Sequence, residues 1–151
     1  MHHNEHTINI MNGTVVDYDG VNGGQNPGFQ KGVLLYLDKI QEQLVNAASA
    51  PGSTNDLQAN VELARICLDN TRKWLGQVID FEQTMLQAQD TASMTQQGKD
   101  SAIIATNMVK GVDANGNGQV EPYEDECGLT QVETFGLLMS TLRLTEGPLP
   151  E

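Results

Sequence analysis

Basic residues are scarce in this chain of 151 residues: eight Lys and Arg stand against 20 Asp and Glu, which gives a formal net charge of −12 at pH 7. So few basic side chains, spread along the chain, cannot form the positive patch that nucleic acids or anionic membranes require. Apolar runs are also short, and none approaches the roughly 18 residues of a membrane-spanning helix. We therefore expect no nucleic-acid partner and no membrane span, whereas divalent cations suit such an acidic surface.

Aromatic residues number only seven, so the core must be built mainly from aliphatic side chains. Hydrophobic residues make up 38% of the chain and 15 further residues are glycine, which together is an ordinary share for a globular protein. The length and composition predict a single domain over residues 1–151.

Only two cysteines are present, Cys67 and Cys127, and they do not form a CxxC pair. A disulfide between them would require an oxidising compartment, and the sequence leaves the bridged and free states open. The N-terminus is polar and rich in histidine, which is unlike a secretory signal peptide.

Hydrophobic periodicity predicts an all-α fold, a bundle of four or five helices. The strongest pattern covers residues 57–88, where apolar side chains recur at spacings of three and four: Leu57, Val61, Ala64, Leu68, Leu75, Val78 and Met85. Other helices are expected over residues 4–12, 29–48, about 102–112, and from a capping box at Thr130 and Glu133 through Leu144. No long segment alternates with the period of a strand.

Loop signals separate these helices. Residues 13–28 are rich in Gly, Asn and Asp and predict a long loop, and residues 50–53 break the chain before Ser53 or Thr54 caps the next helix. Residues 90–93 are expected to form a turn. The tail over residues 145–151 contains two prolines and is predicted to be extended.

Residues 113–124 read DANGNGQVEPYE and resemble the calcium loop of the EF-hand family. The resemblance implies Ca²⁺ as cofactor, held by side-chain oxygens at positions one, three and five, a carbonyl at seven, a ligand at nine and a two-oxygen carboxylate at twelve. These positions are Asp113, Asn115, Asn117, Gln119, Glu121 and Glu124. Gly118 stands at position six, where a sharp turn requires positive φ, and Val120 is expected to face the core.

The resemblance to the EF-hand stops at the loop. Pro122 can start an exit helix, but Gly128 interrupts it within two turns, and Asp125 stands where that helix would present an aromatic side chain to the core. Calcium ligation accounts for Glu121 and Glu124, and solvation is expected for Asp125 and Glu126. The sequence therefore predicts a calcium loop on a helical scaffold that need not open as a sensor does.

A weaker copy of the loop begins at Asp17, because Asp17-Tyr18-Asp19-Gly20 parallels Asp113-Ala114-Asn115-Gly116. The ligands at positions five and twelve are missing from this copy. A second cation would need an irregular site, drawn from Asp17, Asp19, Val21, Gly23 and Asn26. A glycine-rich loop without metal is an equally good interpretation.

The segment His2-His3-Asn4-Glu5-His6 formally fits the HxxEH pattern of zinc peptidases through His2, Glu5 and His6, but this pattern lies at the extreme terminus and not on a long buried helix. We expect His3 and His6 to pack on a helix or a neighbouring subunit, and the alternative is a surface transition-metal site formed by His2 and His6, one helical turn apart. Nucleophile-elbow, phosphate-loop, dinucleotide and haem motifs are absent, so we expect neither an enzyme nor a small-molecule substrate.

The histidine-rich opening, the loop over residues 17–28 and the DANGNG loop together resemble a group of secreted bacterial helical proteins with calcium-type loops. This resemblance implies no known activity. Because extracellular calcium is high enough to saturate a site of modest affinity, we expect an extracellular, calcium-stabilised structural protein that is a self-assembling subunit of a filament, tube or surface layer. Ile8 and Ile10 are candidates to pack between subunits. The alternative is a monomeric calcium sensor or buffer that binds a partner protein.

Overall fold

A computed structural model describes residues 2–18, 20, 21 and 23–141. In this part of the chain the regular elements are five helices, and no strand occurs among its residues: α1 (His2–Asn12), α2 (Val33–Ser49), α3 (Asn55–Gln87), α4 (Thr91–Lys110) and α5 (Leu129–Ser140). The prediction of an all-α bundle is confirmed. The predicted extended tail, residues 145–151, lies outside the described residues.

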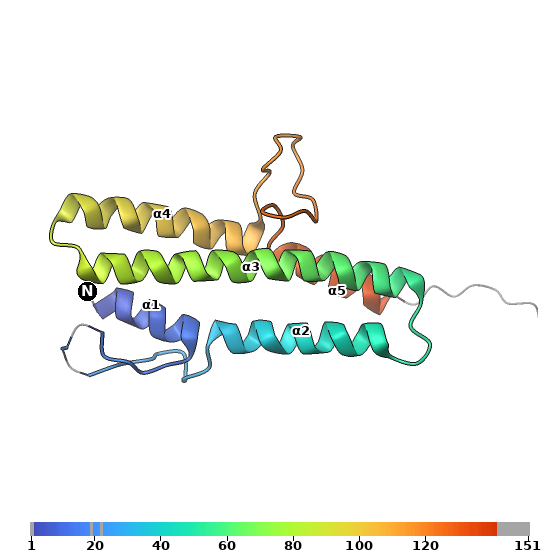
Figure 1. The fold of residues 1–151 in the computed structure, drawn as a ribbon, viewed down its shortest axis with the longest axis horizontal. Helices are drawn as coiled ribbons and strands as arrows, with labels where there is room; N and C mark the ends of the chain where they lie inside the picture. Colours follow the sequence, from blue (N-terminus) through green and yellow to red (C-terminus); the bar gives the residue numbers. More distant parts are fainter. Residues whose placement is uncertain (1, 19, 22, 142–151) are drawn as a thin grey trace, which may run out of the picture.

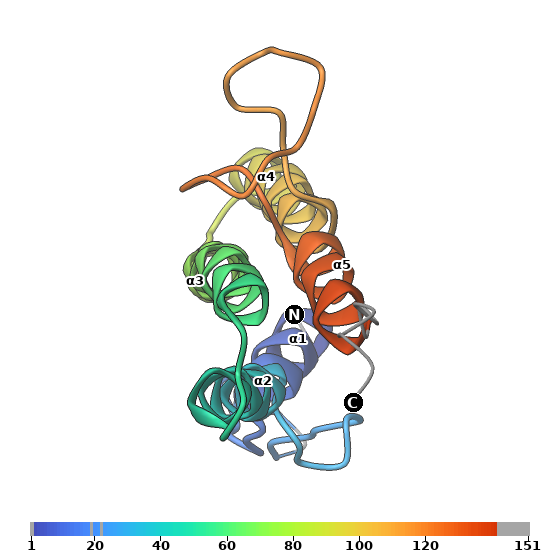
Figure 2. The same cartoon turned by 90° about the vertical axis from the view of Figure 1, so that its right-hand side faces the viewer.

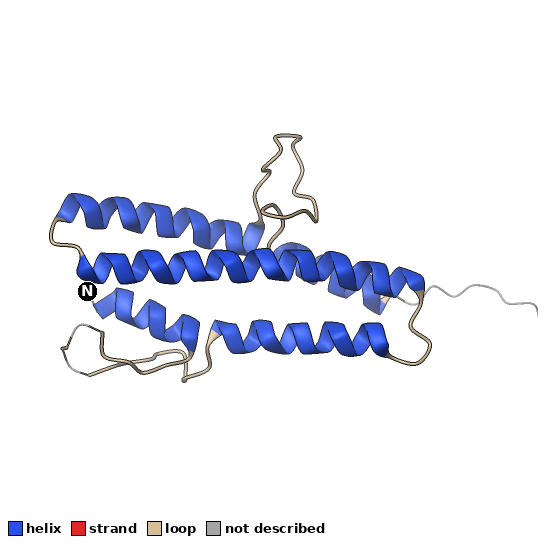
Figure 3. Ribbon diagram, viewed as in Figure 1, coloured by secondary structure: helices blue, strands red, loops and turns tan. Residues whose placement is uncertain are grey.

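The long helix α3 is the axis of the molecule, and the other helices lie along it in two interrupted rows (Figure 1). One row consists of α1 followed by α2, and the other consists of α4 followed by α5, each running antiparallel to α3 (Figures 1 and 2). α3 contacts all four of the other helices. Each row is broken once, and a long loop leaves the bundle at each break (Figure 3).

The stripe predicted for α3 forms the centre of the core. Val61, Ala64, Leu68, Leu75 and Val78 are almost completely buried, as their common face requires. Residues of the other helices close over the stripe: Leu37 and Leu44 from α2, Met108 from α4 and Val132 from α5. Trp74 is the one aromatic side chain among the buried hydrophobic residues of the described part of the chain, so the core is largely aliphatic, as expected.

The helix starts differ from prediction where backbone geometry overrides the apolar pattern. α2 begins at Val33 and not at Phe29, because Phe29 and Gln30 adopt positive φ values of 57° and 58°. Gly32 then passes so close to Asn12 that a Cβ atom at this position would lie 2.5 Å from the Asn12 carbonyl carbon. These contacts place the whole of residues 13–32 in the loop.

The ends of α3, α4 and α5 are set by capping groups. The Thr54 hydroxyl accepts a hydrogen bond from the Leu57 amide at 3.2 Å, and the Asp90 carboxylate accepts one from the Ser93 amide at 2.8 Å. This cap starts α4 at Thr91, so the turn expected over residues 90–93 and the helix start expected near residue 102 are both wrong. The capping box predicted at Thr130 and Glu133 is wrong, because the N-cap of α5 is Gly128, two residues before Thr130. There the Gly128 amide donates to the Gln131 side chain at 2.9 Å, and the helix ends at Ser140, short of Leu144.

Ile8 on α1 is completely buried within the chain. α1 packs against both α2 and α3, so its inner face finds intrachain partners despite the shortness of the helix. The prediction that Ile8 packs between subunits is therefore wrong.

Candidate functional site

The loop between α4 and α5, residues 111–128, projects away from the bundle (Figures 1 and 2). Its two ends are tied together, because the Val112 amide donates a hydrogen bond to the Glu126 carbonyl at 2.7 Å. Gly111 has φ of 77°, and a Cβ atom there would lie 2.5 Å from the same carbonyl oxygen. The loop therefore starts from a fixed base on the bundle.

Asp113 organises the first half of the loop. One oxygen of its carboxylate accepts hydrogen bonds from the amides of Gly116 and Asn117 at 2.7 and 3.0 Å, and the other accepts one from Gly118 at 2.7 Å. Gly116 and Gly118 have φ values of 75° and 86°, which confirms the positive φ predicted at Gly118. Val120 packs against the core as expected.

The polar side chains after Asp113 approach one another within the loop. The Asn117 amide group donates to the Glu121 carboxylate at 2.5 Å, and the Asn115 amide group is 3.5 Å from the same carboxylate. Within the described residues, no three His, Cys, Asp or Glu side chains lie close enough to form a metal-binding group. The predicted ligands are thus neighbours along one loop, with amide groups standing between the carboxylates.

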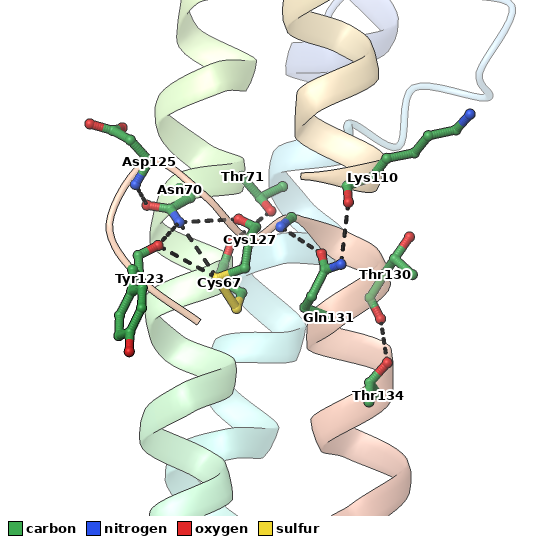
Figure 4. Close-up of a disulfide and its surroundings, with 11 residues drawn as sticks. Cys67, Asn70, Thr71, Lys110, Tyr123, Asp125, Cys127, Thr130, Gln131 and Thr134 are labelled. Atoms are coloured by element: carbon green, nitrogen blue, oxygen red, sulfur yellow. Dashed lines mark hydrogen bonds between the residues drawn. A yellow bond between two sulfur atoms is a disulfide. The ribbon is translucent and has the colours of Figure 1, made fainter. Parts of the chain in front are cut away.

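The chain from residue 123 to 127 is fastened to α3 (Figure 4). Cys127 forms a disulfide with Cys67, which answers the question that the sequence left open. The buried Asn70 side chain donates to the carbonyls of Tyr123 and Cys127 at 2.7 and 3.1 Å and accepts from the Asp125 amide at 2.9 Å. A covalent bond and three hydrogen bonds thus fix the segment that follows the loop.

Glu124, predicted at position twelve, lies over α3. It lines a shallow cleft of about 300 Å³ together with Ile66, Asp69, Asn70 and Lys73. The pKa of Lys73 is raised above its usual value, chiefly by its hydrogen bond with Asp125, and the charge of Glu124 contributes in the same direction. Glu124 therefore belongs to the electrostatic surroundings of Lys73.

Glu126 differs most from the sequence-based expectation. Solvation was predicted for this residue, but it is only 2% exposed. Among the described residues, its carboxylate has hydrogen-bond contacts with the Asn115 amide group alone, at 3.2 and 3.4 Å. The prediction was wrong because the neighbouring Cys127 is bonded into the core and draws Glu126 inward with it.

The loop between α1 and α2 repeats the opening turn of the second loop. The Asp17 carboxylate accepts a hydrogen bond from the Gly20 amide at 2.6 Å, as Asp113 does from Gly116, and Gly20 has φ of 72°. The predicted ligands Val21 and Gly23 are exposed, and the predicted ligand Asp19 lies outside the described residues. The parallel noted in the sequence therefore extends to local geometry over the first turn.

The side chain of Asn26, another predicted ligand, fixes this loop through hydrogen bonds to the backbone. Its side chain donates to the carbonyls of Asn9 and Thr14 at 2.7 and 2.8 Å and accepts from the Gly28 amide at 2.8 Å. Its amide oxygen is thus already used by the protein backbone.

Two buried polar residues of α1 that sequence reasoning did not single out also hold this loop. The Glu5 carboxylate, 1% exposed, accepts from the amides of Tyr18 at 2.9 Å and Gln25 at 3.4 Å. The fully buried Asn9 side chain donates to the carbonyls of Val16 and Gln25 at 2.9 and 3.0 Å. Glu5 and Asn9 are four residues apart and therefore share one face of α1, and this spacing was the feature of the sequence that could have identified them.

Of the N-terminal histidines, the rings of His3 and His6 lie edge to face with centroids 6.3 Å apart. The side chain of His2 lies outside the part of the chain that the structure describes, so the predicted metal pair His2 and His6 stays a prediction. In the HxxEH pattern, Glu5 is occupied by backbone amides of the first loop.

No protein-family model matches this chain, and neither the curated proteins nor the solved structures include one with significant similarity to it. Among the helices of the described residues, none combines the length and the apolar character that crossing a bilayer requires.

Proposed function

We propose that this chain is a calcium-binding extracellular structural protein and that Ca²⁺ acts at the loop between α4 and α5. The observation that carries the proposal is the clustering of oxygen-bearing side chains on this loop: Asp113, Asn115, Asn117 and Glu121 lie around one tight turn. Residues 111–128 include five acidic side chains and no basic one. Ca²⁺ binds through six to eight such oxygens, including backbone carbonyls such as that of Gln119.

The disulfide supports an extracellular location. Disulfides persist in oxidising compartments, and extracellular calcium modules need only affinities of about 10⁻⁴–10⁻³ M. The bond also favours a structural role over the alternative of a calcium sensor. A sensor exposes a groove by opening a helix pair, whereas here Cys127 ties the end of the loop covalently to α3.

The proposed structural role includes assembly of the chain into a filament, tube or surface layer. It is supported by exposed apolar side chains on three separate helices: Leu35 and Tyr36 on α2, Ile103 and Val109 on α4, and Leu137 and Leu138 on α5. Exposed apolar side chains on different helices suit head-to-tail contacts between copies, which generate open polymers. The proposal also includes a second cation at the loop between α1 and α2. It is supported by the opening turn at Asp17, which has the same hydrogen bond as the turn at Asp113.

Thermal unfolding with and without chelator tests the calcium part. Ligand binding to the native state adds about 2.7 kcal/mol at a hundredfold excess over the dissociation constant, so a chelator should lower the melting temperature. Sodium chloride at equal ionic strength is the control for screening of the −12 net charge. Equal changes with chelator and with salt would contradict a specific site.

Light scattering and electron microscopy at high protein concentration test the assembly part. Saturating Ca²⁺ should produce large species that a chelator disperses. A protein that stays monomeric in saturating Ca²⁺ would contradict assembly and leave the calcium-binding module, whose titration is independent of this result.

A further inference from the structure

Phe29 is an aromatic residue that the fold leaves in solvent. It is 89% exposed, which is the largest exposed fraction among the exposed large hydrophobic side chains of the described residues. Single exposed apolar residues are common, but a nearly fully exposed aromatic ring is typical of the residues that anchor protein–protein contacts. Phe29 lies in the loop between α1 and α2, four residues before Val33, where α2 begins.

The backbone on both sides of Phe29 is fixed. The Gly28 amide donates a hydrogen bond to the Asn26 side chain at 2.8 Å, and the Gly28 carbonyl accepts one from the Lys31 amide at 3.2 Å. Gly32, three residues after Phe29, packs closely against the end of α1. Phe29 itself is held at a φ of 57°, which few non-glycine residues adopt. The ring therefore extends from a preorganised backbone, and docking it costs little conformational entropy.

A hollow of about 440 Å³ lies between the C-terminal end of α2 and the first turns of α3. Its lining combines apolar side chains with a polar rim, and its residues are Val45, Ala48, Val61, Gln58, Glu62 and Arg65, together with Ser49. An apolar cavity of about 150 Å³ is enough to bind benzene. The hollow therefore has room for one aromatic side chain.

Phe29 cannot reach the hollow of its own chain. The two features lie at opposite ends of α2 (Figure 1), and the 17 residues of this helix span about 25 Å. The Phe29 ring and the hollow are thus complementary in character but can meet only between two molecules.

The charges beside the two features are also complementary. Lys31, two residues after Phe29, is exposed, and Glu62 on the rim of the hollow is 66% exposed. The ion pair of Glu62 with Arg65 lies in solvent, where such pairs contribute little. Because each copy carries a net charge of −12, a contact between copies is favoured where a basic side chain of one meets an acidic side chain of the other.

We propose that Phe29 of one copy docks into the hollow between α2 and α3 of the next copy. The inference rests on the assembly proposed above and names the contact that produces it. The ring and the hollow are different surfaces of one chain, so every docked copy still has one of them free. A head-to-tail contact of this kind continues into a filament or closes into a ring of subunits.

Two variants remove the two halves of the contact separately. Phe29→Asn removes the ring and introduces a residue that tolerates positive φ. Val45→Lys places a charge in the hollow that repels Lys31, at a helix position that is 50% exposed and that suits lysine. Ile103→Ala is the control, because it removes an apolar side chain that is 58% exposed on α4, away from both features. Circular dichroism should show that all variants keep the wild-type helix content.

Analytical ultracentrifugation at high protein concentration in saturating Ca²⁺ measures the size of the assembled species. We expect large species for wild type and for Ile103→Ala, and association weakened by at least about tenfold for Phe29→Asn and for Val45→Lys. An equimolar mixture of these two variants should form dimers and nothing larger. Each such dimer joins the intact ring of Val45→Lys to the intact hollow of Phe29→Asn and has no further ring or hollow to extend it.

Unchanged association of Phe29→Asn, or a mixture that stays monomeric, overturns the docking inference and leaves the proposed assembly to another contact. Dimers formed by Val45→Lys alone also contradict it, since they would indicate a symmetric contact between two Phe29 rings. Wild-type protein that stays monomeric overturns the inference together with the proposed assembly, and Phe29 and the hollow would then serve a different protein.

Discussion

Removal of the disulfide between Cys67 and Cys127 should destabilise the fold strongly. The bond closes a loop of 60 residues, and the loss of loop-closure entropy in the unfolded chain amounts to about 14 cal/mol/K for a ring of this size. At 25 °C this corresponds to about 4 kcal/mol of stability. That is a substantial part of the roughly 5–15 kcal/mol that holds a domain folded.

Equilibrium unfolding in urea, with chelator present, measures this contribution. The Cys67→Ala/Cys127→Ala variant should lose about 4 kcal/mol and show a steeper dependence on denaturant, because its unfolded chain is less compact and exposes more surface. Reduced wild-type protein is the matched control, since it breaks the cross-link without removing the two buried sulfur atoms.

Equal unfolding midpoints for oxidised and reduced wild-type protein would refute this reasoning. So would the titration of two free thiols in the native protein under non-reducing conditions. A loss in the alanine variant that is absent from the reduced protein would assign the effect to packing around the sulfur atoms and not to the cross-link.

Three further changes test individual features of the fold. Burial holds the pKa of Glu82 above its usual value, against a hydrogen bond from Ser101, so its contribution to stability is present at pH values below the unfolded-state pKa and is lost as the pH rises through the folded-state pKa. Glu82→Gln should therefore raise the melting temperature at pH 7 but not well below pH 4.5, and an equal shift at both would contradict the assignment. Asp90→Ala removes the N-cap of α4 and should cost about 1 kcal/mol in urea unfolding; an unchanged midpoint would show that the cap contributes nothing. Gly111→Ala places a side chain at positive φ against the Glu126 carbonyl and should lower the free energy of unfolding by more than about 1 kcal/mol. Its control, Gly76→Ala, lies on an open helix surface and should raise the free energy of unfolding by up to about 1 kcal/mol. A similar effect of the two variants would contradict a clash at Gly111.

Helices were predictable where one face is continuously apolar. The apolar stripe predicted a helix over residues 57–88, and α3 (Asn55–Gln87) agrees with these bounds to within two residues at each end. The agreement is close because an amphipathic pattern of that length has no competing interpretation. The starts of α2, α4 and α5 were missed because local backbone geometry and capping bonds set them, and not the apolar pattern. The positive φ values of Phe29 and Gln30 and the bond between Gly128 and Gln131 leave no periodic signal.

The candidate site was predictable only in its first half. Asp113, Asn115 and Gly118 follow a local pattern, and their turn geometry agrees with it. The position of Glu126 could not be read from spacing, because it follows from a bond between residues 60 apart in the sequence. Buried polar residues such as Asn70 share this property, since their partners lie in distant segments.

The disulfide also determines how the chain would carry mechanical load. Cys67 and Cys127 close a covalent ring that contains the second half of α3, all of α4 and the projecting loop. Tension applied between the two ends of the chain passes across the sulfur–sulfur bond and bypasses everything inside the ring. The residues inside the ring correspond to about 200 Å of extended chain, at roughly 3.5 Å per residue. This length would therefore not be released when the protein is unfolded by force. The candidate calcium loop lies within this shielded part, so strain along a polymer of such subunits would reach α1, α2 and α5 without pulling the loop open.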